Sequence, residues 1–543
     1  MSRNRCKRRW SMQARPGTLR EMLEGSLITA EELAALEAAG LSELGAKLLR
    51  RIEHDGQEID WRDAKIEKLS FEMAQLKRMK FGKKSEQLDA EQKALFDEAV
   101  DADIAATEDR LKELLAKKKP PREPSERPKR EALPPYLPRV ERRHEPENTT
   151  CACGCKLKRI GEDVSEKLDY TPGAFTVERH IRGKWACAQC RTLTQAPVPA
   201  EIIDKGIPTS GLLAHVLVAK YADHLPLYRQ EAIFGRAGVA LPRSTLGAWI
   251  GVCGLRLQPL VDALKDHVLS CPVVHADETP VAMLAPGNGK THRAYLWAYA
   301  AGAFEPLRAV VYDFTETRAG EHARAFLGDW RGSLVCDDYT GYKASFALGV
   351  TEAGCMAHAR RKFIDLHEAN KSTIAATAIE FIGQLYGIER EVRAMSREQR
   401  LYERRTRAAP IAKALRDWLI AQRTKITNGT ATAKAIDYSL NRWAALMRYL
   451  DDPALPIDNN HDEQQISPWA TGRKNWLFAG TLMAGQRAAA IMSLIQSAKI
   501  NGHDPYAYLS DVLFRLPTHR ANAIGELLPH RWQSSVRPGT SLV

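Results

Sequence analysis

The chain has 543 residues, of which 44% are hydrophobic and 27% are charged, which is the composition of an ordinary globular protein. This length exceeds what one hydrophobic core normally spans, so several folded units are expected. No apolar run reaches the roughly 20 residues that a membrane-spanning helix needs, and no apolar signal core follows the basic opening residues. These features exclude a membrane protein and predict a cytoplasmic one.

The net charge and the cysteine content narrow the class of protein further. The formal net charge is +12. A basic excess of this size favours polyanionic partners, of which nucleic acid is the commonest in a cytoplasm; a merely solvated basic surface is the alternative. Ten cysteines are too sparse for a disulfide scaffold, but five of them lie between Cys151 and Cys190, and this density favours metal binding.

Residues 46–117 are charged and helix-favouring, with almost no glycine or proline. Ile59, Ile66 and Met73 recur every seven residues, and leucines fill the offset positions between them. This pattern predicts a short coiled coil; a single amphipathic helix packed on the body is the alternative. Prolines mixed with charge across residues 118–148 cannot build a core, so they predict an extended linker.

A compact cysteine-rich unit is expected over residues 149–200. Phe175, Val177 and Ile181 alternate as in a strand, so a β-ribbon would bring two cysteine arms together. Thiolates are good zinc ligands, and four of them close a tetrahedral structural Zn²⁺ site; reduced thiols without a metal are the alternative. Four of five candidate ligands would be used, with one spare in the first arm: Cys151, Cys153 and Cys155, then Cys187 and Cys190.

Residues 205–265 are predicted to be helical and to bind DNA. Two glycines, at 235 and 238, interrupt the helical spacing, and a new helix opens at Leu241-Pro-Arg-Ser-Thr-Leu246. A helix, a glycine turn and a second helix that begins with Arg243 and Ser244 form the pattern of a helix-turn-helix reader of DNA. Any two packed helices give the same pattern, so the spacing alone does not distinguish the two interpretations.

From residue 272 the pattern changes to strands that end in acids. Asp277 closes the first expected strand and Asp337 the fourth. The order of elements is that of a ribonuclease-H-like mixed sheet, in which the first and fourth strands are neighbours. The two carboxylates would therefore lie side by side. The expected order is three strands, a helix and a fourth strand, at residues 272–277, 294–300, 309–314, 321–330 and 333–337.

Neighbouring carboxylates suit phosphodiester chemistry with divalent cations. Cleavage by water and attack by a DNA 3′-hydroxyl use two ions about 3.5–4 Å apart, one at the attacking oxygen and one at the leaving oxygen. Mg²⁺ or Mn²⁺ at such a site takes carboxylate oxygens. A third carboxylate is expected on a later helix, at Glu463, with Asp458 or Asn459 as the cap of that helix. Asp338 is the close rival of Asp337, and the other competing acids are Glu278, Asp313, Glu316, Asp458 and Asp462.

Several longer motifs are more specific than these patterns. They are Lys220-Tyr-Ala-Asp-His-Leu-Pro-Leu-Tyr-Arg-Gln230, His275-Ala-Asp-Glu-Thr-Pro280, Cys336-Asp-Asp-Tyr-Thr-Gly-Tyr342, Cys355-Met-Ala-His-Ala-Arg-Arg-Lys-Phe363, Gly472-Arg-Lys-Asn-Trp-Leu-Phe-Ala-Gly480 and Asn501-Gly-His-Asp-Pro-Tyr-Ala-Tyr-Leu509. They resemble motifs of transposases of the insertion-sequence-66 family. The resemblance runs from about residue 46 to residue 516 and includes the predicted coiled coil and the cysteine unit.

The resemblance implies an enzyme that binds the ends of its own mobile element and catalyses Mg²⁺-dependent DNA cleavage and strand transfer. The family's Asp–Asp–Glu triad falls on Asp277, Asp337 and Glu463. The implied partners are double-stranded DNA, as terminal inverted repeats and target, accessory proteins of the same element, and further copies of the chain on DNA. The implied location is a bacterial cytoplasm, at the nucleoid when DNA is bound. Basic residues beside the catalytic helix, Arg473 and Lys474, are expected to contact DNA phosphates.

Two features leave alternatives open. Ser467, one helical turn beyond Glu463, stands where an arginine is expected in related members, which favours a catalytically inactive, transposase-derived DNA-binding protein as the alternative function. A nuclease that only hydrolyses DNA also fits the triad, but it gives no role to the multidomain front end. Cys355 and His358 have metal-ligand spacing; packing in the catalytic domain is preferred over a second metal.

The predicted fold class is multidomain α/β, with a ribonuclease-H-like catalytic domain that contains a helical insertion. A coiled coil, a small zinc ribbon-like unit and a helical DNA-binding region precede that domain. The predicted divisions are a basic helical segment 1–45, the coiled-coil region 46–117, the linker 118–148, the zinc-binding unit 149–200, the DNA-binding region 205–265, the catalytic domain 268–500 with its insertion at about 365–455, and a C-terminal helical segment and tail 501–543.

Overall fold

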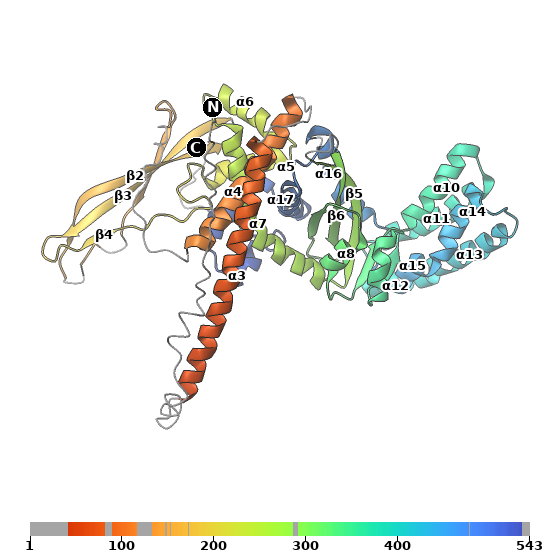
Figure 1. Cartoon of the computed structure of the whole chain (residues 1–543). Coiled ribbons are helices and arrows are strands. Elements are labelled where there is room, and N and C mark those ends of the chain that lie inside the picture. The colour runs from red at the N-terminus through yellow and green to blue at the C-terminus, as the bar shows by residue number, and fades with distance from the viewer. Residues whose placement is uncertain are drawn as a thin grey trace, which may run out of the picture. The chain divides into compact units, whose positions relative to one another are not determined.

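The computed structural model describes residues 42–81, 90–116, 133–146, 149–151, 154–171, 173–285, 291–476 and 478–534 (Figure 1). The chain divides into two compact units, residues 1–71 and 72–543. Most of the predicted N-terminal segment, half of the predicted linker and Cys153 lie outside the described residues. Within the described part, no helix combines the length and the apolar character needed to cross a membrane.

The predicted coiled-coil region contains two helices. Helix α3 (Ser42–Phe81) carries the heptad seam on its less exposed side, where Leu69 and Leu76 are buried, whereas Trp61 and Phe71 are exposed. The coiled coil itself stays a prediction, because a buried stripe also fits the alternative of a packed amphipathic helix.

Helix α4 (Ala90–Ala116) packs against α7 (Arg243–Ser270). The two backbones meet at Gly251, where an added Cβ would lie 2.0 Å from a carbonyl oxygen of α4. An ion pair fastens the same helix, because Asp103 Oδ1 accepts from Arg487 Nη1 at 2.7 Å and the aspartate is wholly buried. Helix α4 is therefore an integral part of residues 72–543.

The cysteine unit is built on a long antiparallel ribbon of β2 (Leu157–Thr171) and β3 (Ala174–Cys187), which Figure 1 shows as two extended arms. Strand β1 (Arg139–His144) adds to β3 in parallel, and the short β4 (Leu193–Gln195) adds to it antiparallel. The sequence predicts the ribbon, whereas β1 falls in the segment assigned to the linker.

Three helices follow: α5 (Ser210–Tyr221), α6 (Leu227–Arg236) and α7. Gly238 adopts φ +83° in the connection between the last two, a conformation that favours glycine. Glu231 on α6 then accepts a hydrogen bond from the first backbone N–H of α7, at 3.1 Å. This contact caps α7 and fixes it against α6.

The second sheet has five strands in the order β7-β6-β5-β8-β9. Strand β5 pairs antiparallel with β6 and parallel with β8, so the first and fourth strands are neighbours, as the sequence predicts. Helix α8 (Gly320–Leu327) connects β7 to β8. The strands are β5 (Val273–Leu284), β6 (Thr291–Ala301), β7 (Val310–Thr315), β8 (Ser333–Cys336) and β9 (Thr351–Gly354).

One expectation about this sheet is wrong: Asp277 does not end its strand, because β5 continues to Leu284. Strand β8 pairs with β5 only as far as His275; beyond it β5 pairs with β6 alone until Met283, where a parallel bridge to Ala479 takes the other side. Between these two pairings one edge of β5 has no partner strand, and such an edge tolerates Pro280.

The outer strand β7 is covered by α17 (Leu482–Ile500). Two serine hydroxyls of this helix accept from the strand's backbone, Ser493 from Tyr312 at 2.8 Å and Ser497 from Val310 at 3.0 Å. Helix α18 (Pro505–Arg515) follows α17 and packs on α5. The edge of the sheet is thereby satisfied rather than left open to another strand.

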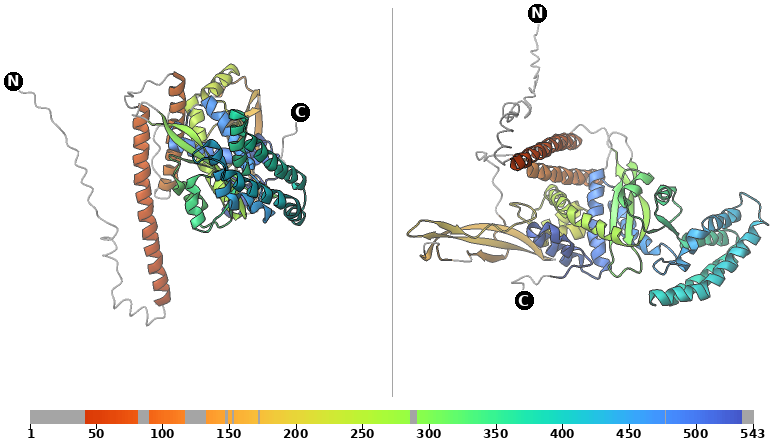
Figure 2. Two further views of the ribbon diagram at one scale, coloured as in Figure 1. Left: turned by 90° about the vertical axis from the view of Figure 1, so that its right-hand side faces the viewer. Right: turned by 90° about the horizontal axis from the view of Figure 1, so that it is seen from below.

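Between β9 and α16 the chain is helical (Figure 2), and these helices share a hydrophobic core with Val273, Val335 and Ala353 of the sheet. Phe363, Leu385 and Leu415 are among the buried members of that core. The helices are α10 (Met356–Asn370), α11 (Thr373–Val392), α12 (Arg397–Glu403), α13 (Ala409–Arg423), α14 (Ala431–Asn441) and α15 (Trp443–Met447), and α16 (Asn460–Trp476) follows them.

Candidate functional site

Two acids meet where β5 and β8 cease to pair. Asp277 lies two residues beyond His275, the last residue of β5 paired with β8, and Asp337 directly follows β8. Each carboxylate is held by a nearby backbone N–H: Asp277 Oδ1 accepts from Glu278 at 2.9 Å, and Asp337 Oδ1 accepts from Tyr339 at 2.8 Å. Parallel pairing thus carries both acids to one place on the sheet.

The phase of β8 separates Asp337 from its rival Asp338. Asp337 is half-buried, whereas Asp338 is exposed and lies 3.5 Å from Arg442 and 3.6 Å from Lys343. Asp338 therefore lies between two cations, of which Arg442 is buried and Lys343 is exposed. The inward position belongs to Asp337, whose charge also acts on Asp277.

Asn459 ties the start of α16 to β5. Its side-chain Nδ2 donates to the Ala276 carbonyl at 2.9 Å, and its Oδ1 accepts from His275 Nδ1 at 2.7 Å. Its backbone carbonyl accepts from the N–H of Glu463 at 3.2 Å, as that of a residue just before a helix does, while its side chain is committed to β5. Of the two predicted caps, Asp458 is the one whose side chain bonds the helix start, because its Oδ1 accepts from the backbone N–H of Asn460, the first residue of α16, at 3.1 Å.

The carboxylates influence one another electrostatically. Burial is the main cause that raises the pKa of Asp277 to about 7, and Glu278, Asp337 and Glu463 raise it further. Asp462 is wholly buried, and neither of its carboxylate oxygens has a hydrogen-bond partner among the described residues. Its pKa is raised well above the ordinary range, first by burial and then by Asp277.

Glu278, by contrast, is balanced by a cation. Arg318 Nε donates to Glu278 Oε1 at 2.8 Å, and Tyr342 donates to Oε2 at 2.8 Å. The side chain of Glu278 is almost fully buried and committed to these two partners. This acid therefore has a structural explanation that Asp277 lacks.

Glu463 faces α10. Its carboxylate lies 3.8 Å from His358 Nδ1 and 3.6 Å from Arg361 Nη2. The ligand atoms of Cys355, His358 and Glu463 all lie within 4.8 Å of one another, a spacing that also suits a metal. Burial raises the pKa of Cys355 to about 12, and its sulfur accepts from the Asn459 backbone N–H at 3.2 Å, so a protonated, packed thiol is the better interpretation.

The predicted DNA-binding residues occupy two helices. Arg243 is the first residue of α7 and is half-buried, and Ser244 beside it is exposed. On α16, Lys474 and Ser467 are exposed. Arg473 has a second role besides the predicted one, because its Nη1 donates to the Thr279 hydroxyl at 3.0 Å and to the Pro280 carbonyl at 2.8 Å, which fastens α16 to β5.

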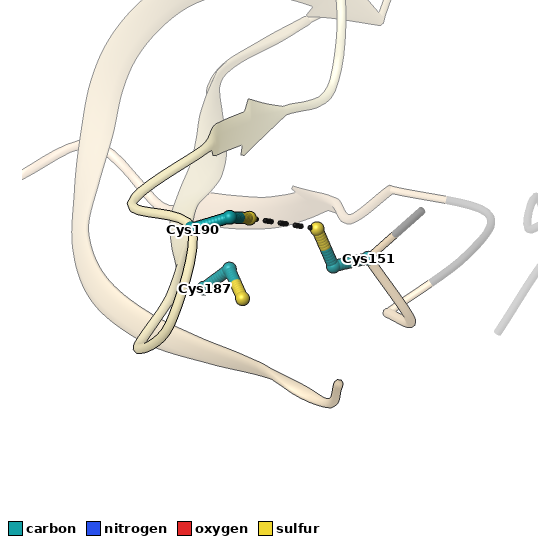
Figure 3. A group of neighbouring side chains, drawn as sticks. All are labelled: Cys151, Cys187 and Cys190. Atoms are coloured by element: carbon teal, nitrogen blue, oxygen red, sulfur yellow. Dashed lines mark hydrogen bonds between the residues drawn. The ribbon is translucent and has the colours of Figure 1, made fainter. Parts of the chain in front are cut away.

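The cysteine arms meet at the end of the ribbon. The sulfurs of Cys151, Cys187 and Cys190 lie within 4.8 Å of one another, and those of Cys151 and Cys190 are 3.1 Å apart (Figure 3). Hydrogen bonds, the largest from Thr192, lower the pKa of Cys190 to about 6. Cys155 instead donates to Gln189 Oε1 at 2.9 Å, and Cys153 lies outside the described residues.

Sequence reasoning missed two contributors to the carboxylate site. Arg361 was not singled out, although its i, i+3 spacing from His358 puts both on one face of α10. The Asn459 side chain, named only as one of two possible caps, was not predicted to join α16 to β5. No local signal reveals that role, because its partners lie more than 180 residues away in the sequence.

Separate family models match the cysteine unit and the region that contains the carboxylates. Models of transposase domains match most of the chain: "Transposase IS66 family" at residues 205–487, "zinc-finger binding domain of transposase IS66" at 148–191, "IS66 C-terminal element" at 493–530 and "Transposase C of IS166 homeodomain" at 68–142. The chain belongs to the IS66 transposase family, a family of DDE-type transposases.

Three proteins of Sinorhizobium fredii (strain NBRC 101917 / NGR234) are similar over most of their length. The protein y4jD is 40% identical over 74% of this chain and 82% of its own length. The protein y4qI is 37% identical over 90% and 92%, and y4hP is 32% identical over 87% and 88%. All three are described as uncharacterized.

Proposed function

We propose that this chain cuts DNA at the ends of its own mobile element and joins them to target DNA, with Asp277, Asp337 and Glu463 as the metal-binding triad. The proposal rests on two acids at the point where neighbouring parallel strands cease to pair, and on the effect that Asp337 and Glu463 have on the pKa of Asp277. The sheet order, with three antiparallel strands followed by two parallel ones, supports a ribonuclease-H-like fold for this region.

The donor set fits hard divalent cations. The Asp277 carboxylate accepts from a backbone N–H, whereas that of Glu278 accepts from the Arg318 cation. Asp277, Asp337 and Glu463 would supply carboxylate oxygens, the ligands that Mg²⁺ or Mn²⁺ prefers. Bound there, the cations supply charge stabilisation at the attacking and leaving oxygens of the phosphodiester.

The chain's own residues position the reaction. Asp277 and Asp337 hold fixed orientations through backbone hydrogen bonds, and Asn459 sets the start of the helix that carries Glu463. His358 and Arg361 flank the Glu463 carboxylate and limit its movement. The acids thus need little rearrangement when DNA arrives.

The remaining parts bind DNA and zinc. Cys151, Cys187 and Cys190, with one further cysteine of the first arm, would hold a structural Zn²⁺ that closes the end of the ribbon. The start of α7, with Arg243 and Ser244, reads the terminal inverted repeats, and residues of α16, Arg473 and Lys474, contact phosphates. Copies of the chain assemble on DNA, with accessory proteins of the same element.

Substitution of each triad acid by its amide tests the proposal. Asp277→Asn, Asp337→Asn and Glu463→Gln keep the side-chain shape but remove a metal ligand. Loss of several kcal/mol of charge stabilisation lowers the cleavage rate by at least about 100-fold. Binding of the element's ends should persist. The measurement is cleavage and joining of labelled end DNA by the full chain in Mg²⁺.

Asp338→Asn is the matched control, because this neighbouring acid faces the surface and should change the rate far less. Near-normal cleavage by any of the three triad variants would remove that residue from the site. Cleaved products without joined products would indicate a nuclease. Specific binding by the wild-type chain with neither product would support the DNA-binding alternative raised by Ser467.

A further inference from the structure

A hollow of about 360 Å³ lies between α10 and α11, beside the carboxylate site. Three arginines line it, together with the first residue of α16 and one face of α11, and none of its lining residues is acidic. We call it the arginine hollow. The side chains on which the argument depends are Arg360, Arg361, Arg390, Tyr386 and Asn460, with Gly383 at the α11 wall.

The charge of the hollow is not balanced as it is elsewhere in the same helices. Arg404 pairs with Glu389, and Arg423 pairs with Asp437, each at under 3 Å. Within the described part of the chain, Arg360 and Arg390 have no such acidic partner. Two acids border the hollow: Asp458, which accepts from Tyr386 and Asn460, and Glu463, which lies near Arg361. Three guanidinium groups against two carboxylates leave a net positive charge, which suits an anionic ligand.

The α11 wall is shaped to leave room. Gly383 lies in the interior of that 20-residue helix, where a glycine costs about 0.5–1 kcal/mol relative to alanine. A Cβ at this position would meet nothing within 4 Å, so packing of the protein on itself does not require the glycine. Because Gly383 has no side chain, the hollow is wider at this position.

The hollow is continuous with the proposed active site. Arg361 lines it and also lies 3.6 Å from the Glu463 carboxylate. Asn460, on the opposite wall, is three residues before Glu463 on α16. A DNA strand that is bound at the carboxylates would therefore place its adjacent backbone phosphates near these arginines.

We propose that the arginine hollow binds backbone phosphates of the DNA strand next to the phosphodiester that is cut. This inference rests on the proposed function, because DNA is the polyanion that a phosphodiester-cleaving site presents. Guanidinium groups suit phosphate oxygens, since they donate paired hydrogen bonds in one plane. The contact positions the strand and carries no base information.

The test measures DNA binding by the full chain in Ca²⁺ or without metal, at several salt concentrations. The double variant Arg360→Ala/Arg390→Ala should lower the slope of log affinity against log salt by about 0.9 for each lost phosphate contact, hence by about 1.8. Arg416→Ala is the matched control, an exposed arginine of α13 that does not line the hollow. It should leave the slope close to that of the wild type.

Two duplexes distinguish the source of the phosphates. Equal weakening for the element's end and for unrelated DNA means that the hollow holds either strand. Weakening confined to the element's end assigns the hollow to the donor strand, and weakening confined to unrelated DNA assigns it to the target. An unchanged slope with both duplexes, in a double variant that melts like the wild type, overturns the inference.

A second variant acts through shape rather than charge. Gly383→Leu fills the hollow, yet it should keep or raise the melting temperature, because leucine favours the helix and its Cβ meets no neighbour. DNA affinity should fall several-fold at the same time. Gly383→Ala gains the same helix preference with less volume and should bind nearly as the wild type does.

Wild-type affinity in Gly383→Leu would contradict the inference. The outcome is separable from that of the catalytic proposal. Cleavage lost in Glu463→Gln with unchanged binding in the arginine variants refutes the hollow alone. Normal cleavage in Glu463→Gln with weakened binding in the arginine variants refutes the triad and leaves a DNA contact.

Discussion

Replacement of Asn459 by alanine should uncouple catalysis from DNA binding. This side chain is 1% exposed and bridges two parts of the site: the Ala276 carbonyl beside Asp277, and the ring of His275. Because its Nδ2 donates to the carbonyl, its Oδ1 must accept, so His275 carries its proton on Nδ1. Burial lowers the pKa of His275 to about 3, which keeps the ring neutral and leaves this arrangement unchanged across ordinary pH.

The magnitude follows from the two groups left behind. In Asn459→Ala, the His275 N–H and the Ala276 carbonyl lose these hydrogen-bond partners. Each buried polar group left unpaired lowers the free energy of unfolding by about 1–3 kcal/mol, hence by about 2–6 kcal/mol in total. Relaxation of α16 toward solvent recovers part of this cost and moves Glu463 away from Asp277. A misplacement of about 1 Å at a reacting centre costs on the order of 100-fold in rate.

The assay combines urea unfolding, end-DNA cleavage and end-DNA binding for Asn459→Ala, His275→Leu and the double variant. The double variant should lose less stability than the sum of the single ones, because it leaves fewer unpaired groups. Gln464→Ala, at an exposed position on the same helix, should stay within about 0.5 kcal/mol of the wild type. The reasoning fails if the two losses add and Asn459→Ala cleaves DNA at the normal rate.

Two further predictions concern other parts of the molecule. The full chain should carry about one zinc per copy by elemental analysis; Cys187→Ser should lose it, Cys271→Ser should keep it, and a full complement of zinc in Cys187→Ser would refute the assignment. Burial, with help from His267, lowers the pKa of His530 to about 4, below its unfolded value of about 6.5. The folded state then binds the proton less well, so this contribution to stability is complete above about pH 6.5 and is lost as the pH falls toward 4. Urea midpoints at pH 7 and pH 5 should therefore differ less in His530→Phe than in the wild type, and an equal difference would contradict this.

The two acids and the adjacency of their strands could be predicted from the sequence, because both depend on a local pattern. Short apolar runs ending in Asp277 and Asp337, with a helix before the second, are enough to place two strands side by side. The strand ends were less predictable. Pro280 looks like a stop, and only the tertiary pairing reveals that β5 has a free edge there. Strand β9 has four residues, too few to show an alternating pattern.

The packing of the N-terminal helices was harder to predict for a related reason. Heptad spacing is enough to predict α3, whereas the packing of α4 depends on residues far along the chain, such as Gly251 and Arg487. A helical pattern records which face is apolar but not what covers it. The same limit applies to Arg473, whose charge predicts a phosphate contact and whose hydrogen bonds also lead to β5.

The geometry of the carboxylates depends on one helix and one strand more than on the long segment between them. Asn459 fastens the start of α16 to Ala276, and Arg473 fastens its far part to Thr279. The stretch of β5 that contains Asp277 lies between these two attachments, which together with His358 and Arg361 of α10 set the position of Glu463. The core of the helices that precede α16 includes Leu385 and extends to Val335 of β8, two residues before Asp337. Changes at Val335 should therefore disturb the spacing of the acids, whereas changes within α11 should first alter stability or DNA contact at the arginine hollow, because α11 lines the hollow and carries no acid of the triad.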